Sequence, residues 1–422
     1  MLSSPIPSRS LAIAALSTIV EWYDFTLYLY FATVLSRVFF GGGAAGVADA
    51  LAGFALAYLM RPLGAVVFGH VGDRFGRRAT MLLSMALMTG AMLATALLPT
   101  HAQAGPAAGW MLIGLRCLMA FSVGGEYTGV VAYLLEGARP QRRGLVTSLA
   151  SGASEIGALL AAGLSAASVA LLDEASLAAW GWRLPFLFGA ALAGVILLAR
   201  ATIAESPDFE RQKAEGSVPA NPLRHSLTRH RAAIARGFAI SALGSITYYV
   251  GITYVPIFLT EVGRIDEAQA LGLSTLAALA VIAATPLTGL LTDRVGRRPV
   301  LIGLGAAWLC LSLPLFLLMT ASYAAALAGA ILLACLGGAV SAVGAVATAE
   351  QFPGEGRLSG LAFGATSATA LFGGVAPWLA HRLVEATGWP LVPGAMIALV
   401  ALGVLPVFLT MPETAPAKRA DP

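Results

Sequence analysis

The stretch GHVGDRFGRR at residues 69–78 lies between two long apolar runs, and the stretch GLLTDRVGRR at residues 289–298 repeats it in similar surroundings. Six of the ten aligned positions are identical. A repeat that recurs after half of the chain predicts two halves that are built in the same way. The sequence therefore indicates a duplicated fold, in which each half contains one copy of the charged turn.

The repeated turn has the residue types expected between two helices at a membrane surface. Gly69 allows helices to approach closely, whereas Arg74 and Arg77 are too costly to bury in lipid. Asp73 lies within reach of arginines and of helix N-termini, whose dipoles attract carboxylates. A basic loop that only fixes membrane topology is the simpler interpretation. Because the turn occurs twice in matching places, we favour a functional role in both halves.

The composition is typical of a membrane protein. Hydrophobic residues make up 58% of the 422 residues, charged residues make up 11%, and the mean hydropathy is +0.80. A soluble domain of this length would carry about a quarter charged residues. The apolar residues fall in blocks of about 20 or more, which is long enough to cross a bilayer as a helix. We therefore predict an all-α membrane protein rather than a β-barrel.

The apolar blocks predict twelve transmembrane helices. Their approximate limits are 11–38, 47–69, 79–98, 107–135, 144–171, 184–204, 234–260, 268–291, 299–319, 321–349, 358–385 and 391–411. Basic residues gather in every second loop, so the positive-inside rule places both termini in the cytoplasm. This asymmetry also accounts for the formal charge of +4 without nucleic acid as a partner.

A polar stretch between the sixth and seventh spans divides the chain. We predict an N-terminal six-helix bundle at 1–204, a cytoplasmic linker at 205–231, and a C-terminal six-helix bundle with a short cytoplasmic tail at 232–422. The cysteines Cys117, Cys310 and Cys335 lie in apolar segments without metal-ligand spacing. We therefore expect neither a disulfide framework nor a metal site.

Acidic and basic residues near the repeated turns also recur. Glu136 is followed by Arg143, and Glu350 by Arg357, at the same spacing and in the same place in each half. These residues predict a cytoplasmic ion-pair network whose formation and loss set the balance between two conformations. The residues of this predicted gate are Gly69, Asp73, Arg74, Arg77, Glu136, Arg143, Asp293, Arg294, Arg297, Glu350 and Arg357.

Several ionisable side chains lie well inside the predicted spans, where each needs a partner or a water-filled cavity. Glu21, Asp24 and Tyr28 have the spacing i, i+3, i+7 and share one helical face. Arg61 lies in the second span, immediately before Pro62. An arginine can grip a carboxylate through two parallel hydrogen bonds, so this face predicts a site for an anionic or zwitterionic solute.

Further charges come from the fourth and fifth spans, namely Arg116, Glu126 and Glu155. With two arginines and three or four carboxylates, we expect a single, nearly balanced buried cluster in the N-terminal half. A carboxylate in a low-dielectric site can hold a proton near neutral pH, so the cluster would also couple a solute to protons. The alternative is that these charges pair only with one another and fix helix packing.

The C-terminal half has almost no charge inside its spans. The seventh span instead carries Ser241, Ser245, Tyr248 and Tyr249. We expect this half to supply hydroxyls and aromatic walls, with only one of the two adjacent tyrosines facing the cavity, because neighbouring residues on a helix point in different directions.

The motifs together resemble a known family. Gly69-x-x-x-Asp73–Arg74-x-Gly76–Arg77–Arg78 and its second copy resemble the loop signature of the major facilitator superfamily. The segments that resemble its metabolite:proton symporter family are Glu21–Trp22–Tyr23–Asp24–Phe25, Arg61–Pro62–Leu63–Gly64, Gly124–Gly125–Glu126, Gly181–Trp182–Arg183–Leu184–Pro185–Phe186 and Glu205–Ser206–Pro207. The resemblance implies two pseudo-symmetric six-helix bundles, alternating access and proton-coupled uptake at the bacterial inner membrane. It also implies that the Asp73 turn is a cytoplasmic latch, and that Arg61 and Arg116 act on the substrate or in coupling.

We accordingly predict a secondary active transporter that imports a small organic acid anion, of the di- or tricarboxylate type, together with protons. The predicted substrate-binding residues are Arg61, Arg116, Tyr28, Tyr248, Tyr249 and Glu155, and the predicted proton-coupling residues are Glu21, Asp24 and Glu126. We expect a monomer in the lipid bilayer, without a cofactor other than the coupling proton. No nucleophile–base pair or phosphate loop suggests an enzyme.

Three alternatives remain open at this point. The first is symport of a zwitterionic compatible solute, because the stretch from Thr247 to Pro256 resembles the proline/betaine branch, although Glu155 departs from the expected pattern. The second is proton-coupled drug efflux, which would need a cavity dominated by carboxylates, with Arg61 hidden. The third is a nutrient sensor that does not transport, which would need a signalling extension.

Overall fold

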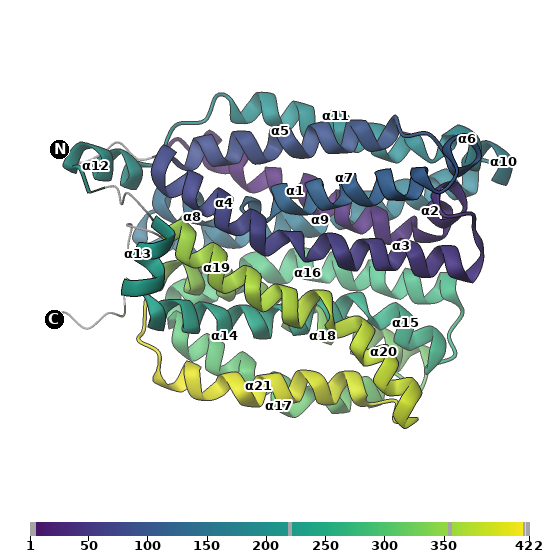
Figure 1. Ribbon diagram of the computed structural model, residues 1–422. Helices are drawn as coiled ribbons and strands as arrows, with labels where there is room; N and C mark the ends of the chain where they lie inside the picture. Colours follow the sequence, from purple (N-terminus) through teal and green to yellow (C-terminus); the bar gives the residue numbers. More distant parts are fainter. Residues whose placement is uncertain (1–5, 218–221, 353–356, 417, 419–422) are drawn as a thin grey trace.

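The computed structural model describes residues 6–217, 222–352, 357–416 and 418. Within these ranges the secondary structure is helical, with no strand. The long helices lie side by side, and both chain ends and the linker helices lie at the same end of the bundle (Figure 1). We call this end the terminal side; the charge distribution of the sequence predicts that it is cytoplasmic.

The first six spans contain most of the chain's intramembrane charges. Their long helices are α1 (Ser8–Tyr30) and α2 (Ala32–Phe39), α3 (Gly43–Tyr58) and α4 (Met60–Phe75), α5 (Arg77–Ala96), α7 (Ala107–Val123) and α8 (Glu126–Gly137), α9 (Arg143–Leu171), and α11 (Arg183–Arg200). The connections contain α6 (His101–Ala104), η1 (Pro140–Arg142), α10 (Glu174–Ser176) and the π-helix η2 (Leu177–Gly181). Three of these spans are interrupted, where α1, α3 and α7 end. The breaks lie close to the predicted site residues Tyr28, Arg61 and Glu126.

In the last six spans, π-helices interrupt two of the described spans. The six spans are α14 (Arg231–Tyr248), η3 (Tyr249–Thr253) and α15 (Val255–Glu261), α16 (Glu267–Val295), α17 (Arg297–Leu318), α18 (Tyr323–Glu350), α19 (Arg357–Thr369), η4 (Ala370–Gly374) and α20 (Ala376–Thr387), and α21 (Val392–Thr410). Two short helices, α12 (Pro207–Glu215) and α13 (Pro222–Arg229), form the linker. The segments η3 and η4 are π-helices, which occur frequently at functional sites.

The membrane class follows from the helices themselves. Ten helical segments among the described residues are long and apolar enough to cross a membrane. The segments α1–α2 and α14–α15 run alongside them and bring the number to twelve (Figure 1). The predicted all-α membrane fold is thereby confirmed.

Buried apolar side chains of the described residues form three clusters. One lies within the first half and contains Tyr23, Phe39 and Trp182, and a second lies within the last half and contains Phe258 and Trp308. The third cluster combines residues of both halves, for example Tyr133 with Leu358. The two halves thus have separate cores and share a third apolar contact between them.

Candidate functional site

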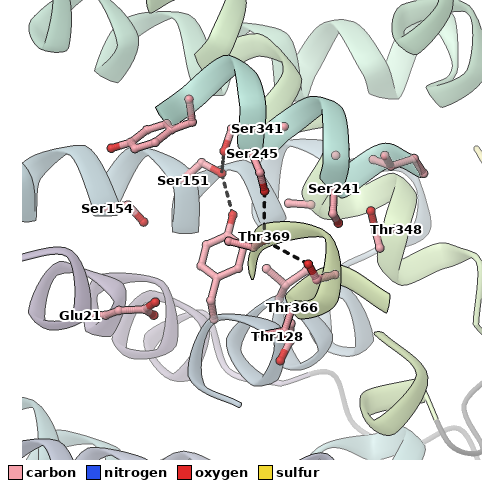
Figure 2. Close-up of a pocket in the computed structure, with 18 of the residues that line it drawn as sticks. Glu21, Thr128, Ser151, Ser154, Ser241, Ser245, Ser341, Thr348, Thr366 and Thr369 are labelled. Carbon is pink, nitrogen blue, oxygen red and sulfur yellow. Dashed lines mark hydrogen bonds between the residues drawn. The ribbon is translucent and has the colours of Figure 1, made fainter. Parts of the chain in front are cut away.

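A cavity lies between the two halves, with a volume of about 170 Å³. Its wall from the last half combines small apolar residues with aromatic rings and hydroxyls, including those of Ser241, Ser245 and Thr369 (Figure 2). The carboxylate and guanidinium groups in its lining are those of Glu21, Arg61 and Glu155. All three come from the first half, so the charged face of the cavity is opposite a hydroxyl-rich face.

Arg61 is held in the cavity wall by contacts on several sides. It donates hydrogen bonds to the carboxylate of Glu21 and, at 2.6 Å, to the hydroxyl of Tyr58. Its guanidinium carbon lies 4.4 Å from the ring centroid of Phe25. The α3–α4 break follows Tyr58 by one residue and places this tyrosine beside the arginine. Arg61 is thereby oriented towards the cavity while remaining only 8% exposed.

The expectation that only one of Tyr248 and Tyr249 faces the cavity was wrong, because both line it. Helix α14 ends at Tyr248, and the π-helix η3 begins at Tyr249. A π-turn is wider than an α-turn, so it changes the angle between adjacent side chains. The hydroxyl of Tyr249 bonds to that of Tyr58, which connects the two halves beside Arg61.

Glu155 lies elsewhere in the same wall, on α9. It is 5% exposed and lies close to Tyr248, which lines the same cavity. Ser151 and Ser154 line the cavity from the same helix. Ser151 also joins a hydroxyl chain across the halves, 3.0 Å from the Tyr127 hydroxyl and 3.3 Å from that of Ser341 (Figure 2). No salt bridge to Glu155 occurs in the part of the chain that the structure describes.

Arg116 and Asp24 form a second ion pair, at 2.7 Å, which does not line the cavity. Arg116 also donates a hydrogen bond to Thr95 at 3.3 Å, and its guanidinium carbon lies 5.5 Å from the ring centroid of Tyr28. Tyr28 is fully buried and donates its hydroxyl to the Ala50 carbonyl at 2.8 Å. In this conformation Arg116, Asp24 and Tyr28 therefore lie in the interior of the first half.

Glu126 has a partner that the sequence analysis did not identify. Arg200, at the end of α11, donates hydrogen bonds to both oxygens of Glu126, and also to Ser17 and to the Met81 carbonyl. Both members of the pair are completely buried. Arg200 is the last residue of an apolar run, and such a position resembles an ordinary basic helix end.

The predicted single charge cluster is therefore replaced by three separate pairs. Each pair is near one face of α1, where Ser17, Glu21 and Asp24 have the spacing i, i+4, i+7 and contact three different arginines. Only the Glu21–Arg61 pair reaches the cavity. Because each buried charge already has its own counter-ion, apolar side chains can pack in the space between neighbouring pairs.

At the terminal side, each repeated turn contacts a helix of the opposite half. Asp73 accepts backbone N–H bonds from Leu358 at 3.2 Å and Ser359 at 2.8 Å, in the first turn of α19. Asp293 accepts the equivalent bonds from Gly144 at 2.8 Å and Leu145 at 2.9 Å, in the first turn of α9. A carboxylate at a helix N-terminus is favoured by unpaired N–H groups and by the helix dipole.

Arg77 and Arg297 support these aspartates within their own halves. Arg77 lies 2.9 Å from Asp73 and 3.1 Å from Glu136. Arg297 lies 3.1 Å from Asp293 and 3.0 Å from Glu350. The carboxylates of Glu205 and Glu413 accept the backbone N–H groups that begin α5 and α17. Burial raises the pKa of Glu205 above its ordinary value, although these N–H bonds oppose the shift.

Ion pairs also cross between the halves. Arg357 lies 2.9 Å from Glu136 and 3.1 Å from Asp208 of the linker helix α12, a partner that the sequence did not indicate. Arg143 is 3.9 Å from Glu350. Arg74 and Arg294 are exposed and, among the described residues, form no salt bridge. The contacts of the two aspartates and of these arginines, which we call the latch, close the terminal side in this conformation.

Close backbone packing accompanies the latch. A Cβ atom at Gly69 would lie 3.0 Å from the Cα atom of Ser359 on α19. A Cβ atom at Gly289 would lie 2.7 Å from the carbonyl oxygen of Gly144 on α9. The first distance is tight, and the second requires the backbone of one helix to move. Glycine at these positions therefore lets helices of opposite halves approach each other closely.

Comparisons with known proteins agree with this architecture. Residues 11–221 match the family described as Sugar (and other) transporter, and residues 264–422 match the Major Facilitator Superfamily. The chain is 31% identical to a glycine betaine/proline/ectoine/pipecolic acid transporter of Dickeya dadantii, over 98% of this chain and 85% of that protein. It is 30% identical to a citrate-proton symporter of Klebsiella pneumoniae, over 91% of this chain and 87% of that protein. Its fold is similar to that of a proton:xylose symporter bound to 6-bromo-6-deoxy-D-glucose, with a TM-score of 0.79, 21% identity and 96% of each chain covered.

Proposed function

Because this chain belongs to the major facilitator superfamily and, within it, to the metabolite:proton symporter family, we propose that it couples uptake of a small carboxylate-bearing solute to proton entry. The observation that carries the proposal is the Arg61–Glu21 pair, which lines a cavity between the two halves. A bacterial inner membrane is the location that fits its bacterial relatives.

The pair couples solute to proton through competition for one arginine. Arg61 stays protonated, and it bonds to only one oxygen of Glu21, whereas the other oxygen is buried and has no partner among the described residues. When a solute carboxylate binds Arg61, Glu21 loses its counter-ion inside a low-dielectric site. A proton on Glu21 then replaces the lost pairing, so solute and proton load together.

Asp24 offers a second position for a coupling proton. Its Oδ2 atom accepts a hydrogen bond from Arg116, whereas its Oδ1 atom is buried without a partner among the described residues. Since Asp24 lies one helical turn from Glu21 on α1, a movement of α1 during loading would disturb both pairs. We therefore propose Arg116 as the counter-ion of Asp24 rather than as a direct solute ligand, and we propose Glu126 as the partner of Arg200 in a structural pair.

Alternating access follows from the position of the latch. The latch closes the terminal side, so in the proposed orientation the cavity exchanges solute with the opposite, periplasmic side. Neutralising the charges of the loaded cavity would favour separation of the Asp73 and Asp293 turns, and the solute would leave towards the cytoplasm. A ligand shifts such an equilibrium only through its different affinity for the two states.

Two classes of solute fit this mechanism. Organic acid anions are supported by the guanidinium and the hydroxyls that line the cavity, and one relative is a citrate-proton symporter. Zwitterionic compatible solutes are supported by the carboxylate of Glu155 in the same lining, and another relative transports glycine betaine and proline. Drug efflux is less well supported, because Arg61 lines the cavity and Asp24 does not.

The test is uptake into proteoliposomes with and without an imposed pH gradient, inside alkaline, for citrate, α-ketoglutarate, proline and glycine betaine. We expect at least one solute to accumulate only with the gradient. Arg61→Ala should abolish its binding, because the carboxylate loses its charged partner. Glu21→Gln should keep solute exchange but lose gradient-driven accumulation.

The exposed Arg382, which pairs with Glu385 outside the cavity, provides a matched control. Arg382→Ala should transport like the wild type. Accumulation that is equal with and without the gradient would contradict proton coupling, and normal solute affinity in Arg61→Ala would remove this arginine from the site.

A further inference from the structure

Glu155 is a buried carboxylate that the coupling mechanism above does not use. It lines the cavity from α9 and is 5% exposed. Arg61, Arg116 and Arg200 are each paired with another carboxylate, namely Glu21, Asp24 and Glu126. Within the described residues, no basic side chain forms a salt bridge with Glu155. The cavity thus has one carboxylate more than it has guanidinium groups.

An unmatched carboxylate in a cavity wall favours a ligand with a positive charge. An isolated buried charge is costly, and a counter-ion removes much of that cost. Tyr248, a neighbour of Glu155 in the cavity wall, has a hydroxyl but supplies no positive charge. A cationic group of a solute would supply the missing charge inside the cavity.

Two aromatic rings in the wall of the same cavity suit such a cation. Tyr248 lies in edge-to-face contact with Trp22, with ring centroids 4.9 Å apart, and both side chains line the cavity. Aromatic faces attract ammonium groups, and quaternary ammonium groups in particular bind among such rings. The carboxylate and the two rings together therefore resemble a cation site rather than a site for a second carboxylate.

The cavity has a positive pole at Arg61 and a negative pole at Glu155. Two adjacent tyrosines connect these poles. Tyr249 bonds to Tyr58, which accepts a hydrogen bond from Arg61. Tyr248 lies close to Glu155, and the ring centroids of the two adjacent tyrosines are 5.5 Å apart. The π-helix that begins at Tyr249 thus places one tyrosine at the positive pole and its neighbour at the negative pole.

We propose that Glu155, with Trp22 and Tyr248, binds the cationic nitrogen of a zwitterionic solute whose carboxylate pairs with Arg61. This inference rests on the proposed function of the same cavity, and it selects zwitterions over di- and tricarboxylates. A solute with a second carboxylate in place of the nitrogen would face Glu155 and be repelled. Glu155 therefore determines specificity, whereas Arg61 is common to both solute classes.

The test uses two pairs of probes that differ only in the charged nitrogen. Glycine betaine is compared with 3,3-dimethylbutanoate, and L-proline with cyclopentanecarboxylate, by equilibrium binding to the purified protein. The wild type should bind at least one zwitterion about tenfold or more tighter than its carbon isostere, as expected for a desolvated cation site. Glu155→Gln should reduce this preference to less than about threefold and leave isostere binding within about threefold.

Two further variants keep the test decisive. Glu385→Gln, which removes an exposed carboxylate outside the cavity, should retain the preference, and Glu155→Asp should retain part of it. Thermal unfolding of each variant shows whether the fold is intact. If Glu155→Gln proves unfolded, Glu155→Asp must still weaken zwitterion binding more than isostere binding, or the inference is wrong.

The outcomes separate this inference from the proposed function. If citrate accumulates with the pH gradient and no zwitterion does, symport stands and the cationic subsite is wrong. An unchanged zwitterion preference in Glu155→Gln would also overturn the subsite without affecting symport. Failure of every solute to accumulate under a gradient, in contrast, would overturn the proposed function itself.

Discussion

Asp73 and Asp293 occupy equivalent places in the two halves, but the surroundings that support them differ. Each aspartate accepts two backbone N–H bonds from the first turn of a helix in the other half. The first copy is reinforced by Arg357, whose two carboxylate partners lie 2.9 and 3.1 Å away. The equivalent arginine of the second copy, Arg143, lies 3.9 Å from its carboxylate and is 28% exposed.

The second copy relies more on backbone packing. Gly289 and Gly144 approach so closely that a Cβ atom on either would lie within 2.7 Å of the other's carbonyl oxygen. At the first copy, a Cβ atom on Gly69 would be 3.0 Å from its nearest neighbour. The two copies of the motif therefore have similar geometry, but different contacts stabilise them. The linker helix α12, which supplies Asp208, contributes to the first copy only.

Among the substitutions that test this comparison, replacement of the two aspartates should lower the uptake rate most. Asp73→Asn and Asp293→Asn each weaken two charge-assisted bonds to a helix N-terminus, and such bonds contribute about 1.5–3 kcal/mol each. We expect each variant to lower the initial uptake rate about tenfold or more, because the closed state of the terminal side is lost. Solute affinity should stay within about threefold, since neither residue lines the cavity.

The rate is measured in proteoliposomes, and the affinity by equilibrium binding to the purified protein. Because both copies have the same cap geometry, the two single variants should agree within about threefold, and the double variant should be slower than either. Equal losses of rate and affinity would contradict a latch. A large loss in only one of the two would show that one copy alone closes the terminal side.

Substitution of Arg357 and Arg143 should distinguish the two copies, with an effect on the uptake rate that is intermediate in size. Arg357→Met removes the partner of two carboxylates, one of them completely buried, and we expect a three- to tenfold loss of uptake rate, or about 1 kcal/mol. Arg143→Met removes a longer and more exposed contact, and its effect should be less than about twofold. Each variant serves as the control of the other, and equal losses would contradict the asymmetry.

Much of this architecture could be predicted because the sequence contains repeats and periodic patterns that correspond to it. The duplicated turns and the paired acidic and basic residues indicated where Asp73, Arg77 and Glu136 and their second copies would gather. The i, i+3 spacing of Glu21 and Asp24 placed both on one face of α1. These patterns are local or symmetric, so they can be recognised without knowing how the helices pack.

What the sequence did not predict depends on distant packing or on local departures from α-helix geometry. Arg200 pairs with Glu126 across 74 positions of the chain, and nothing in its own surroundings distinguishes it from a helix end. The two tyrosines share the cavity only because a π-helix begins between them, and ordinary helical spacing excludes that arrangement. The contact of Asp208 with Arg357 requires the fold of the linker, which has no counterpart in the repeat.

Asp208 provides the smallest and most specific test of the difference between the copies. Its side chain is 21% exposed and contacts Arg357 at 3.1 Å, so Asp208→Asn should slow uptake by about two- to threefold at low salt. The loss should shrink at high salt, because screening weakens exposed pairs while leaving buried ones. Glu210→Gln, on the same helix and exposed, is the matched control and should change nothing. If Asp208→Asn slowed uptake as much as Arg357→Met, the linker would be the main anchor of the first copy. If it matched the control, the asymmetry would instead belong to the Arg357–Glu136 pair alone.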